Sequence, residues 1–414
     1  MATLVLITDT FPFDGALEHT FIEPSLPYLV QAFDRMIVAP ERLVGRQRPL
    51  PAGVMLDQTL AKALERGRFG HLVRGATSWD MDREVFGNPW LLFRWLTLAR
   101  AALFISRAKI TGKWAERFIA QHGLQPGSVV FCTFWLFHAA HGLSSLKRRL
   151  PELHMVSQAH GADLYEARHS PPYIPCRDRT IALLDAIYPD SAEGVAYLKA
   201  HPASRHTTVE VARLGTPDPE VRCAPSRDGI LRVVSCSSLM PVKRVDMIVA
   251  GIAALARRRP DLRIDWQHFG GGEQHGIIEV AARALPPSVT WTIAGHVPAE
   301  EIIAWYRKNP VDVFINVSSS EGTPVSAMEA ASFGIPIVAT AVGGNREIVT
   351  AANGFQLDPE PTPAAIAETL EWFAGNPDKA AALRDGSRAV WERNYAARVN
   401  FPAFAARLRA RAKG

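Results

Sequence analysis

The chain has 414 residues, of which 48% are hydrophobic and 21% are charged, and this length favours two domains over one compact core. The formal net charge is only +5, with the basic residues spread along the sequence. This pattern argues against a nucleic-acid partner and agrees better with a mild attraction to an anionic membrane surface.

Cysteine usage and the N-terminal sequence bear on the compartment. The four cysteines, Cys132, Cys176, Cys223 and Cys236, are far apart and form no C-x-x-C pair. We therefore expect buried thiols in a reducing compartment rather than disulfides or a zinc site. The chain opens without a signal-peptide pattern, and no uncharged apolar run reaches the length of about 18 residues that spans a membrane. These features predict a cytoplasmic protein.

The first predicted element is a short apolar strand over residues 4–7, followed by a turn-rich loop over 8–15. A helix is then expected to begin near Glu18, and a second strand lies over 36–39. This order is typical of a doubly wound α/β domain. An ordinary helix-capping role and a binding role explain Glu18 equally well.

A segment over about 52–122 is longer than a normal connection and is predicted to be helical. Its stretch 90–105 is strongly apolar and is interrupted only by Arg94 and Arg100. The stretch is either a pair of helices packed on the core or a surface in the interface of an anionic membrane. The triplet Asp80-Met81-Asp82 resembles a D-x-D metal motif, but we interpret it as a chance match and expect no metal.

Strands are also predicted over 129–133 and 154–160, and the second ends at His160 and Gly161. Glycine permits a sharp turn, and a histidine can share a proton near neutral pH. His160 is therefore a candidate for a ligand contact at the sheet edge, and the alternative is a structural histidine bonded to a loop carbonyl. Arg177, in a later loop and helix start, either contacts an anionic acceptor or is a surface charge.

The second half of the chain repeats the pattern of the first. Residues 215–222 contain two prolines and a glycine and form the best linker signal. A strand over 231–237 then opens a second domain, and Lys243 lies in the loop that follows it. A later strand ends in three glycines at 270–272, where the backbone can approach a ligand closely.

Residues 313–330 carry the strongest functional signal. A buried apolar strand is predicted first, then a polar loop with Glu321, then a helix that begins at Pro324 and contains Glu329. The free backbone N–H groups and the dipole at the start of this helix favour an anionic group. A nucleotide sugar, with hydroxyls and phosphates, would satisfy both carboxylates and the helix start, whereas the simpler interpretation is an acidic loop before an ordinary helix.

Glu321 and Glu329 reproduce the E-x7-E motif of glycosyltransferase family 4. The run 320–330 resembles the signature of that family almost position by position, and segments 334–340 and 343–349 also match its pattern. The resemblance is specific over about 231–355 and looser over 1–215.

This resemblance implies the GT-B fold, an α/β architecture with two Rossmann-like domains that face each other across a cleft. We expect residues 1–218 to form an acceptor-binding domain with a helical insertion at about 52–122. Residues 219–395 would form the domain that binds the nucleotide sugar. Residues 396–414 would form a terminal helix that crosses back to the first domain.

The resemblance also implies roles for individual residues. His160, Glu321 and Lys243 would be catalytic, while Glu18, Asp163 and Arg177 would bind the acceptor. Donor binding would fall to a larger set, namely Ser238, Lys243, Gly271, His296, Gly322, Thr323, Pro324, Val325 and Glu329. The chain departs from the family pattern at Ser238, where the family has an arginine that grips the diphosphate together with the lysine.

The function implied is a retaining, metal-independent hexosyltransferase that needs no cofactor beyond its nucleoside-diphosphate sugar. The wider pattern resembles enzymes of bacterial exopolysaccharide or lipopolysaccharide assembly, so the expected acceptor is a glycan or a polyprenyl-linked sugar at the inner face of the cytoplasmic membrane. The alternatives are a sugar-nucleotide epimerase or hydrolase of related fold and a non-catalytic nucleotide-binding scaffold. A dinucleotide dehydrogenase is unsupported, because no G-x-G-x-x-G follows the first strand.

Overall fold

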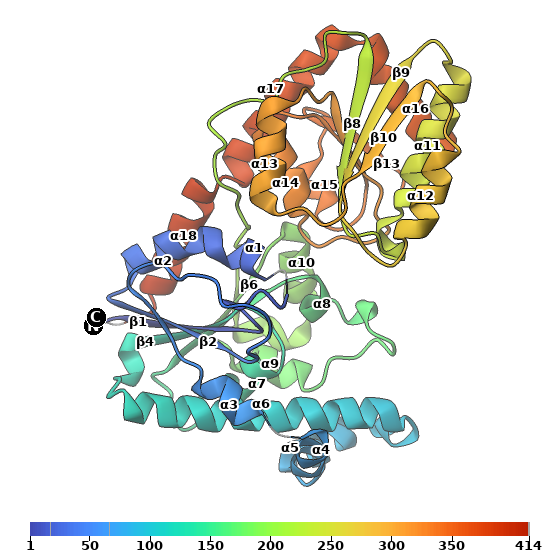
Figure 1. Cartoon of the computed structure of the whole chain (residues 1–414). Helices are drawn as coiled ribbons and strands as arrows, with labels where there is room; N and C mark the ends of the chain where they lie inside the picture. The colour runs from blue at the N-terminus through green and yellow to red at the C-terminus, as the bar shows by residue number, and fades with distance from the viewer. Residues whose placement is uncertain (17, 66, 413–414) are drawn as a thin grey trace. The chain divides into compact units, whose positions relative to one another are not determined.

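The computed structural model describes residues 1–16, 18–65 and 67–412, which divide into two compact units (Figure 1). Unit 1 comprises Met1–Leu214 and Asn400–Gly414, and unit 2 comprises Gly215–Val399. The first boundary thus follows Leu214, where the sequence led us to expect it after residue 218. The second follows Val399, where we expected residue 395.

Unit 1 contains a parallel sheet, seven-stranded within the described residues, with the order β3-β2-β1-β4-β5-β6-β7. In its register, Leu6 of β1 pairs with Val38 of β2 and with Cys132 of β4. The strands are β1 (Thr3–Thr8), β2 (Arg35–Pro40), β3 (Val54–Leu56), β4 (Val129–Thr133), β5 (His154–Ala159), β6 (Ala186–Pro189) and β7 (Thr208–Val209).

Helices cover both faces of this sheet, which explains why its central strands read as unbroken apolar runs. Val5 and Ile7 pack into one buried cluster, and Leu4 and Leu6 pack into the other, as the two-residue period of a strand requires. The helices are α1 (His19–Ile22), α2 (Leu26–Ala32), α3 (Thr59–Leu64), α4 (Arg68–Ala76), α5 (Trp79–Gly87), α6 (Trp95–Gln121), α7 (His138–Ser144), α8 (Gly161–Leu164), α9 (Arg177–Leu183), α10 (Ala192–Ala200) and α18 (Ala397–Arg409).

The segment 52–122 forms β3, the helices α3 to α6 and a 3₁₀ turn, η2 (Pro89–Phe93). Figure 1 shows the long helix α6 running along one side of the unit 1 sheet. The helix pairs approach closely at glycines: a Cβ on Gly75 of α4 would lie 1.8 Å from the Ala102 carbonyl oxygen of α6. A Cβ on Gly142 of α7 would lie 2.2 Å from the Ala108 oxygen of the same helix.

Stretch 90–105 is partly buried and partly exposed. Leu91, Ala101 and Ile105 are buried in the unit, whereas Phe93 and Trp95 are 89% and 73% exposed. Asp80 of the D-x-D triplet accepts a hydrogen bond from Arg179 at 2.9 Å. In the parts of the chain that the structure describes, no group of three metal-binding side chains is found, and no helix has both the length and the apolar character to cross a bilayer.

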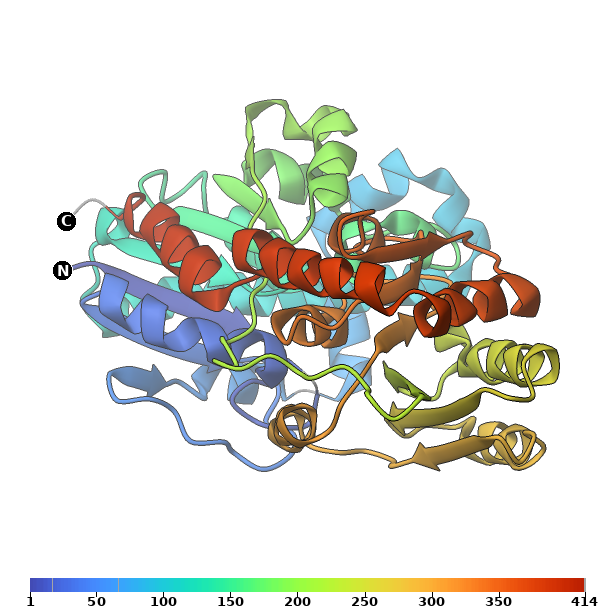
Figure 2. The ribbon, with the colours of Figure 1, turned by 90° about the horizontal axis from the view of Figure 1, so that it is seen from above.

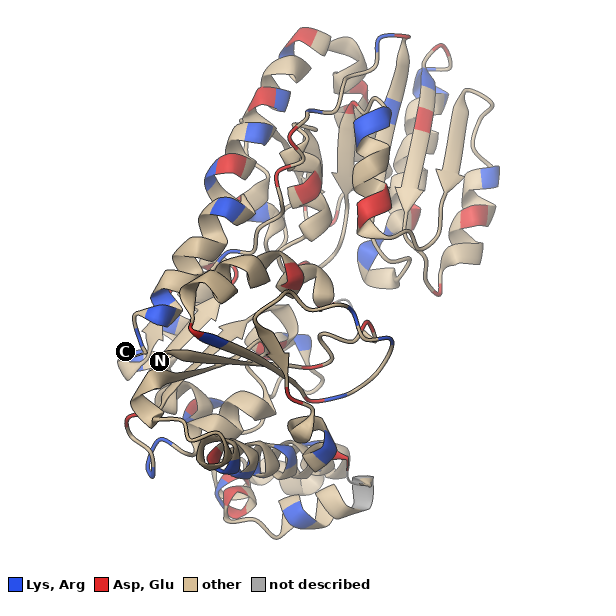
Figure 3. Ribbon diagram, turned by 60° about the vertical axis from the view of Figure 1, so that its left-hand side comes forward, with Lys and Arg blue, Asp and Glu red and all other residues tan. Residues whose placement is uncertain are grey.

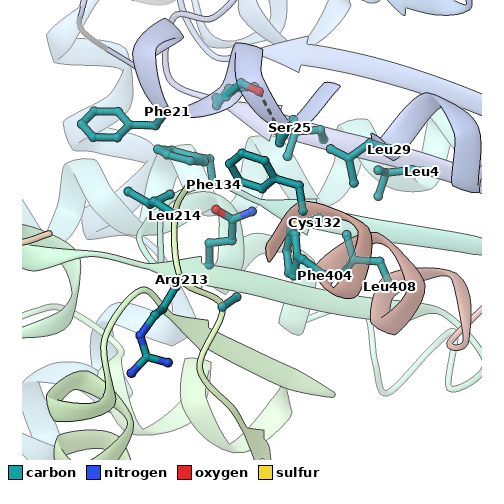
Figure 4. A pocket seen from close by; sticks show the side chains of 15 residues that line it. Leu4, Phe21, Ser25, Leu29, Cys132, Phe134, Arg213, Leu214, Phe404 and Leu408 are labelled. Atoms are coloured by element: carbon teal, nitrogen blue, oxygen red, sulfur yellow. Dashed lines mark hydrogen bonds between the residues drawn. The ribbon is translucent and has the colours of Figure 1, made fainter. Parts of the chain in front are cut away.

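Helix α18 completes the core of unit 1. Phe404 and Leu408 join Leu4 and Leu29 in one buried cluster, and Figure 2 shows α18 in red beside the blue N-terminal elements. A cavity of about 20 Å³ lies among these side chains (Figure 4). Its volume is close to that of one water molecule, so this face of the sheet is packed rather than open to a ligand.

Unit 2 contains a second parallel sheet, six-stranded within the described residues, with the order β10-β9-β8-β11-β12-β13. The strands are β8 (Ile230–Cys236), β9 (Arg263–Phe269), β10 (Val289–Ile293), β11 (Val313–Asn316), β12 (Ile337–Thr340) and β13 (Gly354–Leu357). The flanking helices are α11 (Val245–Arg258), α12 (His275–Arg283), α13 (Ala299–Lys308), α14 (Val325–Ser332), α15 (Asn345–Ile348), α16 (Pro363–Gly375) and α17 (Pro377–Asn394).

Helix α14 follows the predicted strand and loop, but it begins at Val325, and Pro324 is the residue before its first turn. Figure 3 shows Lys and Arg interspersed with Asp and Glu along the helices of both units.

The α4–α6 contact provides a test of the packing of the insertion. Gly75→Ala is expected to weaken it by about 1–3 kcal/mol, because the added methyl group has no room. Gly70→Ala in the same helix is the control, since no other group lies within 4 Å of the position that its added methyl would take, and it should stabilise α4 by about 0.5–1 kcal/mol. Hydrogen–deuterium exchange of the α4 amides should therefore be faster in the first variant only, and equal protection in both would contradict this packing.

Candidate active site

Loops that follow three strands of unit 2, β8, β9 and β11, are hydrogen-bonded to one another. The Leu239 N–H donates to Gly271 at 2.9 Å, which joins the β8 and β9 loops. The Ser319 N–H donates to Val242 at 2.9 Å, which joins the β11 and β8 loops. Because all strands are parallel, these loops lie at one edge of the sheet, where α/β folds bind ligands. The structure thus brings the predicted donor-binding segments together.

Two glycines allow this close approach. Gly270 has a φ of +139°, and a Cβ there would lie 1.8 Å from the Ser237 carbonyl oxygen. Gly343, after β12, has a φ of +47°, and a Cβ there would lie 2.0 Å from the Glu321 carbonyl oxygen. Larger side chains at either position would push the loops apart.

Lys243 and Glu321 form the central contact of this loop cluster. The Lys243 ammonium donates to both carboxylate oxygens of Glu321, at 2.7 and 2.8 Å. The Glu321 Oε1 also accepts from the Ser318 hydroxyl at 2.6 Å and from the Asn316 amide at 3.0 Å. The Glu321 side chain is 7% exposed and that of Lys243 is 23% exposed, so the carboxylate is fixed while the ammonium reaches solvent.

Arg244, the neighbour of Lys243, is turned away from this pair. It adopts a left-handed conformation with a φ of +49°. Its guanidinium donates to the carbonyl oxygens of Val317, Ser318 and Pro359, at 2.6–3.1 Å. Arg244 therefore ties the β8 loop to the β11 and β13 loops and does not substitute for the arginine that Ser238 replaces. The Ser238 hydroxyl itself makes no hydrogen bond with the described residues.

Glu329 lies in the second turn of α14 and lacks such support. Within residues 1–16, 18–65 and 67–412, no hydrogen bond reaches its carboxylate. Burial, followed by the nearby Glu300, raises the pKa of Glu329 to about 7. A ligand that donates hydroxyl hydrogens to the carboxylate would favour its ionised form.

The other predicted donor-binding residues surround these groups. Gly322, Thr323 and Pro324 lead into Val325 at the start of α14, and the Thr323 hydroxyl is buried and unpaired in the described structure. A Cβ on Gly271 would lie 3.5 Å from the backbone nitrogen of His296, so the β10 loop adjoins the glycine loop.

In unit 1, His160 follows β5 and stands between aromatic rings. Its ring centre lies 4.4 Å from that of Phe134 and 5.0 Å from that of Trp135. Its Nδ1 lies 3.3 Å from an oxygen of Asp190, and its Nε2 is buried without a partner among the described residues. Burial opposes protonation of the imidazole, but the hydrogen bond and charge of Asp190, together with the charges of Asp163 and Glu18, outweigh it, so the pKa of His160 is raised.

The three predicted acceptor-binding residues bond to their own chain. Glu18 accepts backbone N–H groups of the loop after β1, at 2.8–3.0 Å, and the Trp135 indole N–H at 2.9 Å. Asp163 accepts the N–H groups of His160 and Leu136, both at 2.7 Å. Arg177 donates to the carbonyls of Asp163 and Leu164, at 2.8 and 2.7 Å.

These bonds make the three residues supports for the loops around His160. Their contact with an acceptor stays a prediction.

Sequence reasoning did not identify Asn316, Ser318, Trp135 or Asp190. Each lies at or just after the end of a strand, as His160 does, and this position was the available signal.

Comparison with known proteins shows similarity to glycosyltransferases. Residues 225–390 match the family model described as glycosyl transferases group 1. A relative, D-inositol 3-phosphate glycosyltransferase of Streptomyces coelicolor, is 26% identical over 64% of this chain and 65% of its own. A second, from Pseudarthrobacter chlorophenolicus, is 28% identical over 41% of this chain and 43% of its own. The chain thus spans less than two thirds of the length of these relatives.

Similarity to solved structures extends over nearly the whole chain. Sucrose-phosphate synthase from Thermosynechococcus elongatus is 14% identical, with a TM-score of 0.70 over 99% of both chains. At these identities the likeness concerns the fold, and it confirms the predicted GT-B architecture with two Rossmann-like sheets. Residues 225–390 thus resemble the group 1 glycosyltransferases, and the fold of the chain is the GT-B fold.

Proposed function

We propose that the protein is a retaining glycosyltransferase that moves a hexosyl group from a nucleoside-diphosphate sugar to a hydroxylated acceptor. The observation that carries this proposal is the Lys243–Glu321 pair, fixed beside the start of α14 in a family-matched segment. The ammonium is partly exposed, and the adjacent helix start offers free N–H groups. Together they favour a bound diphosphate.

Leaving-group stabilisation is the main chemical task of such a site. As the bond from the sugar to the diphosphate breaks, negative charge grows on the phosphate oxygens. Lys243 and the N-terminal end of α14 would stabilise this charge without moving, because their own contacts hold them in place. With Ser238 in place of the family arginine, Lys243 would carry the larger share.

Binding and orientation of the donor would fall to the two carboxylates. Glu329 would accept hydroxyl hydrogens from the ribose, which its unpaired carboxylate lacks in the free protein. Glu321, whose carboxylate is held by Lys243, Asn316 and Ser318, would accept a sugar hydroxyl. In unit 1, the unpaired Nε2 of His160 would be available to bond a sugar hydroxyl.

An acceptor linked to a lipid would suit the exposed side chains of the insertion. We define the apolar patch as the side chains, 58–89% exposed, of Trp79, Phe86, Leu92, Phe93, Trp95 and Leu96. Arg94 and Arg100 lie within the same segment, and the Arg83 guanidinium stands 5.5 Å from the Trp79 ring centre. Aromatic rings with interspersed arginines fit the interface of an anionic bilayer. This would place the enzyme in polysaccharide assembly at a membrane.

The rival functions predict different products and binding. An epimerase or hydrolase would convert the nucleotide sugar with no acceptor added, whereas a transferase would convert it faster when an acceptor is present. A scaffold would bind the nucleotide without turnover. Product analysis with and without a mixture of glycan acceptors separates the three.

Lys243→Ala is expected to weaken binding of a nucleoside diphosphate by about tenfold or more, because a charge-assisted contact to phosphate is lost. Calorimetric titration with UDP, GDP and ADP would measure the loss and also reveal the base. Lys308→Ala, which removes an exposed lysine of α13, is the matched control and should leave the affinity unchanged. If none of the three nucleotides binds the wild-type protein, the proposed donor site is wrong.

The pKa of Glu329 makes donor binding dependent on pH. If the ribose hydroxyls bind the carboxylate form, affinity for UDP-glucose or GDP-mannose should rise as the pH increases from 6 to 8, by up to about tenfold. A proton is then released on binding near pH 7, which titrations in buffers of different ionisation enthalpy detect. Glu329→Gln should bind more weakly at pH 8 and show a flat profile, and an unchanged slope in this variant would refute the assignment.

Exchange of Phe93 and Trp95 for glutamate should reduce co-sedimentation with vesicles of phosphatidylglycerol and phosphatidylcholine by roughly tenfold. The control carries the same exchange at Ile277 and Val280, exposed apolar residues of α12 in unit 2, and should sediment like the wild type. Equal loss in both variants would show nonspecific adhesion.

A further inference from the structure

A second pocket lies within unit 1, at the ends of β1, β2 and β4, and it has a volume of about 290 Å³. All of the residues that line it belong to unit 1. Its walls are largely apolar, with Ile7, Trp135, Phe137 and Ala139 among the lining residues, and Asp9, Glu41 and His138 supply the charged and polar side. The volume is at the lower end of the range of about 300–1,000 Å³ for small-molecule sites, which suits one ring rather than a nucleotide.

Glu41 is the unusual residue in this pocket. It follows β2, its side chain is 7% exposed, and its Oε1 receives no hydrogen bond from the described residues. The His138 Nε2 lies 2.9 Å from this oxygen, but the same nitrogen accepts the Arg107 Nε–H at 3.0 Å. A nitrogen that accepts from Arg107 cannot at the same time donate to Glu41.

A buried carboxylate oxygen without a donor is costly, so a donor from outside the chain would be favoured. The charge of Glu41 is already balanced, because the Arg107 guanidinium lies 3.8 Å from Oε2. Asp9 is similarly paired with Arg42, whose Nε donates to it at 2.7 Å. A cation therefore gains little in this pocket, and an anion would face two carboxylates. A neutral hydroxyl group satisfies Oε1 without disturbing this balance.

We propose that this pocket binds an uncharged hydroxylated ring, a neutral sugar, whose hydroxyl donates to Glu41 Oε1 while its C–H face packs on the aromatic wall. The inference deepens the proposed function and rests on it in one respect: the ring in this pocket is the acceptor, or the acceptor sugar next to the attacking hydroxyl. It defines the acceptor as a glycan unit without phosphate or carboxylate at this position. Glu41 is then a specificity-determining residue.

The test measures binding directly and does not depend on turnover. Saturation-transfer NMR titrations on the full chain, with and without UDP, would use methyl α-glucoside, methyl α-galactoside and methyl α-mannoside as neutral probes and glucose 6-phosphate as the anionic probe. The wild type should bind at least one neutral glycoside and should not bind the phosphate. Glu41→Gln should weaken the neutral glycoside about tenfold, because the amide is a weaker acceptor than the carboxylate.

The anionic probe distinguishes recognition from a structural role. Loss of the Glu41 charge should allow glucose 6-phosphate to bind the variant more tightly than it binds the wild type, which a fold defect would not produce. Glu152→Gln, at an exposed position of the same unit, is the control and should behave as the wild type. Tighter binding of the phosphate to the wild type, unchanged affinities in Glu41→Gln, or no neutral glycoside bound would each overturn the proposal.

The outcome can be separated from that of the proposed function. Nucleotide titration with Lys243→Ala reports on unit 2 alone. Glycoside binding without any nucleotide binding would leave the pocket assignment standing and remove the transferase, and the reverse result would do the opposite.

Discussion

The constraint on which this structure depends is the burial of parallel strands on both faces. A strand covered by helices on both sides has few places for a polar side chain along its length, so polar groups collect where the strands end. In unit 2 this applies to Lys243 after β8 and Glu321 after β11, and in unit 1 to Glu41 after β2 and His160 after β5. Chemistry at the strand ends is thus a consequence of how the core is made.

At these ends the charged groups are bound to one another or to the backbone. Glu321 is held by Lys243, His160 by Asp190, and Glu18 by three N–H groups of the loop it stabilises. Such contacts offset the cost of removing charge from water and keep the loops in one conformation. Three polar groups differ from these because they have no hydrogen-bond partner among the described residues. They are the carboxylate of Glu329, Oε1 of Glu41 and Nε2 of His160.

Much of the fold could be predicted from the sequence, because its signals are local. The apolar run before Glu321, the proline before α14 and the glycines after β9 each act through near neighbours, and the family resemblance extends over the same stretch. The joining of the Lys243 and Glu321 loops also followed from parallel strand order. The unit boundary after Leu214 was harder to predict from the sequence, because the prolines that mark the linker lie a few residues later.

The rest depends on contacts between distant segments. Arg244 is directed to three carbonyls by its left-handed backbone, which no pattern in the sequence indicates. Glu41, Arg107 and His138 come from β2, α6 and α7 and meet only in the folded unit. The hydrogen bonds from backbone N–H groups to Glu18 likewise could not be predicted without knowing the conformation of the loop. The sequence left a capping role and a binding role equally open for Glu18, and the tertiary geometry adds that its carboxylate holds the loop after β1.

The position of α18 has a consequence for the order of folding during synthesis. Unit 1 needs Phe404 and Leu408 to cover Leu4 and Leu29, yet these residues leave the ribosome only after all of unit 2. At a synthesis rate of about 5–20 residues per second, the apolar face of unit 1 that α18 covers stays exposed for on the order of ten seconds. During that time the nascent first unit exposes a surface that invites chaperone binding, and its folding becomes complete only with the last helix.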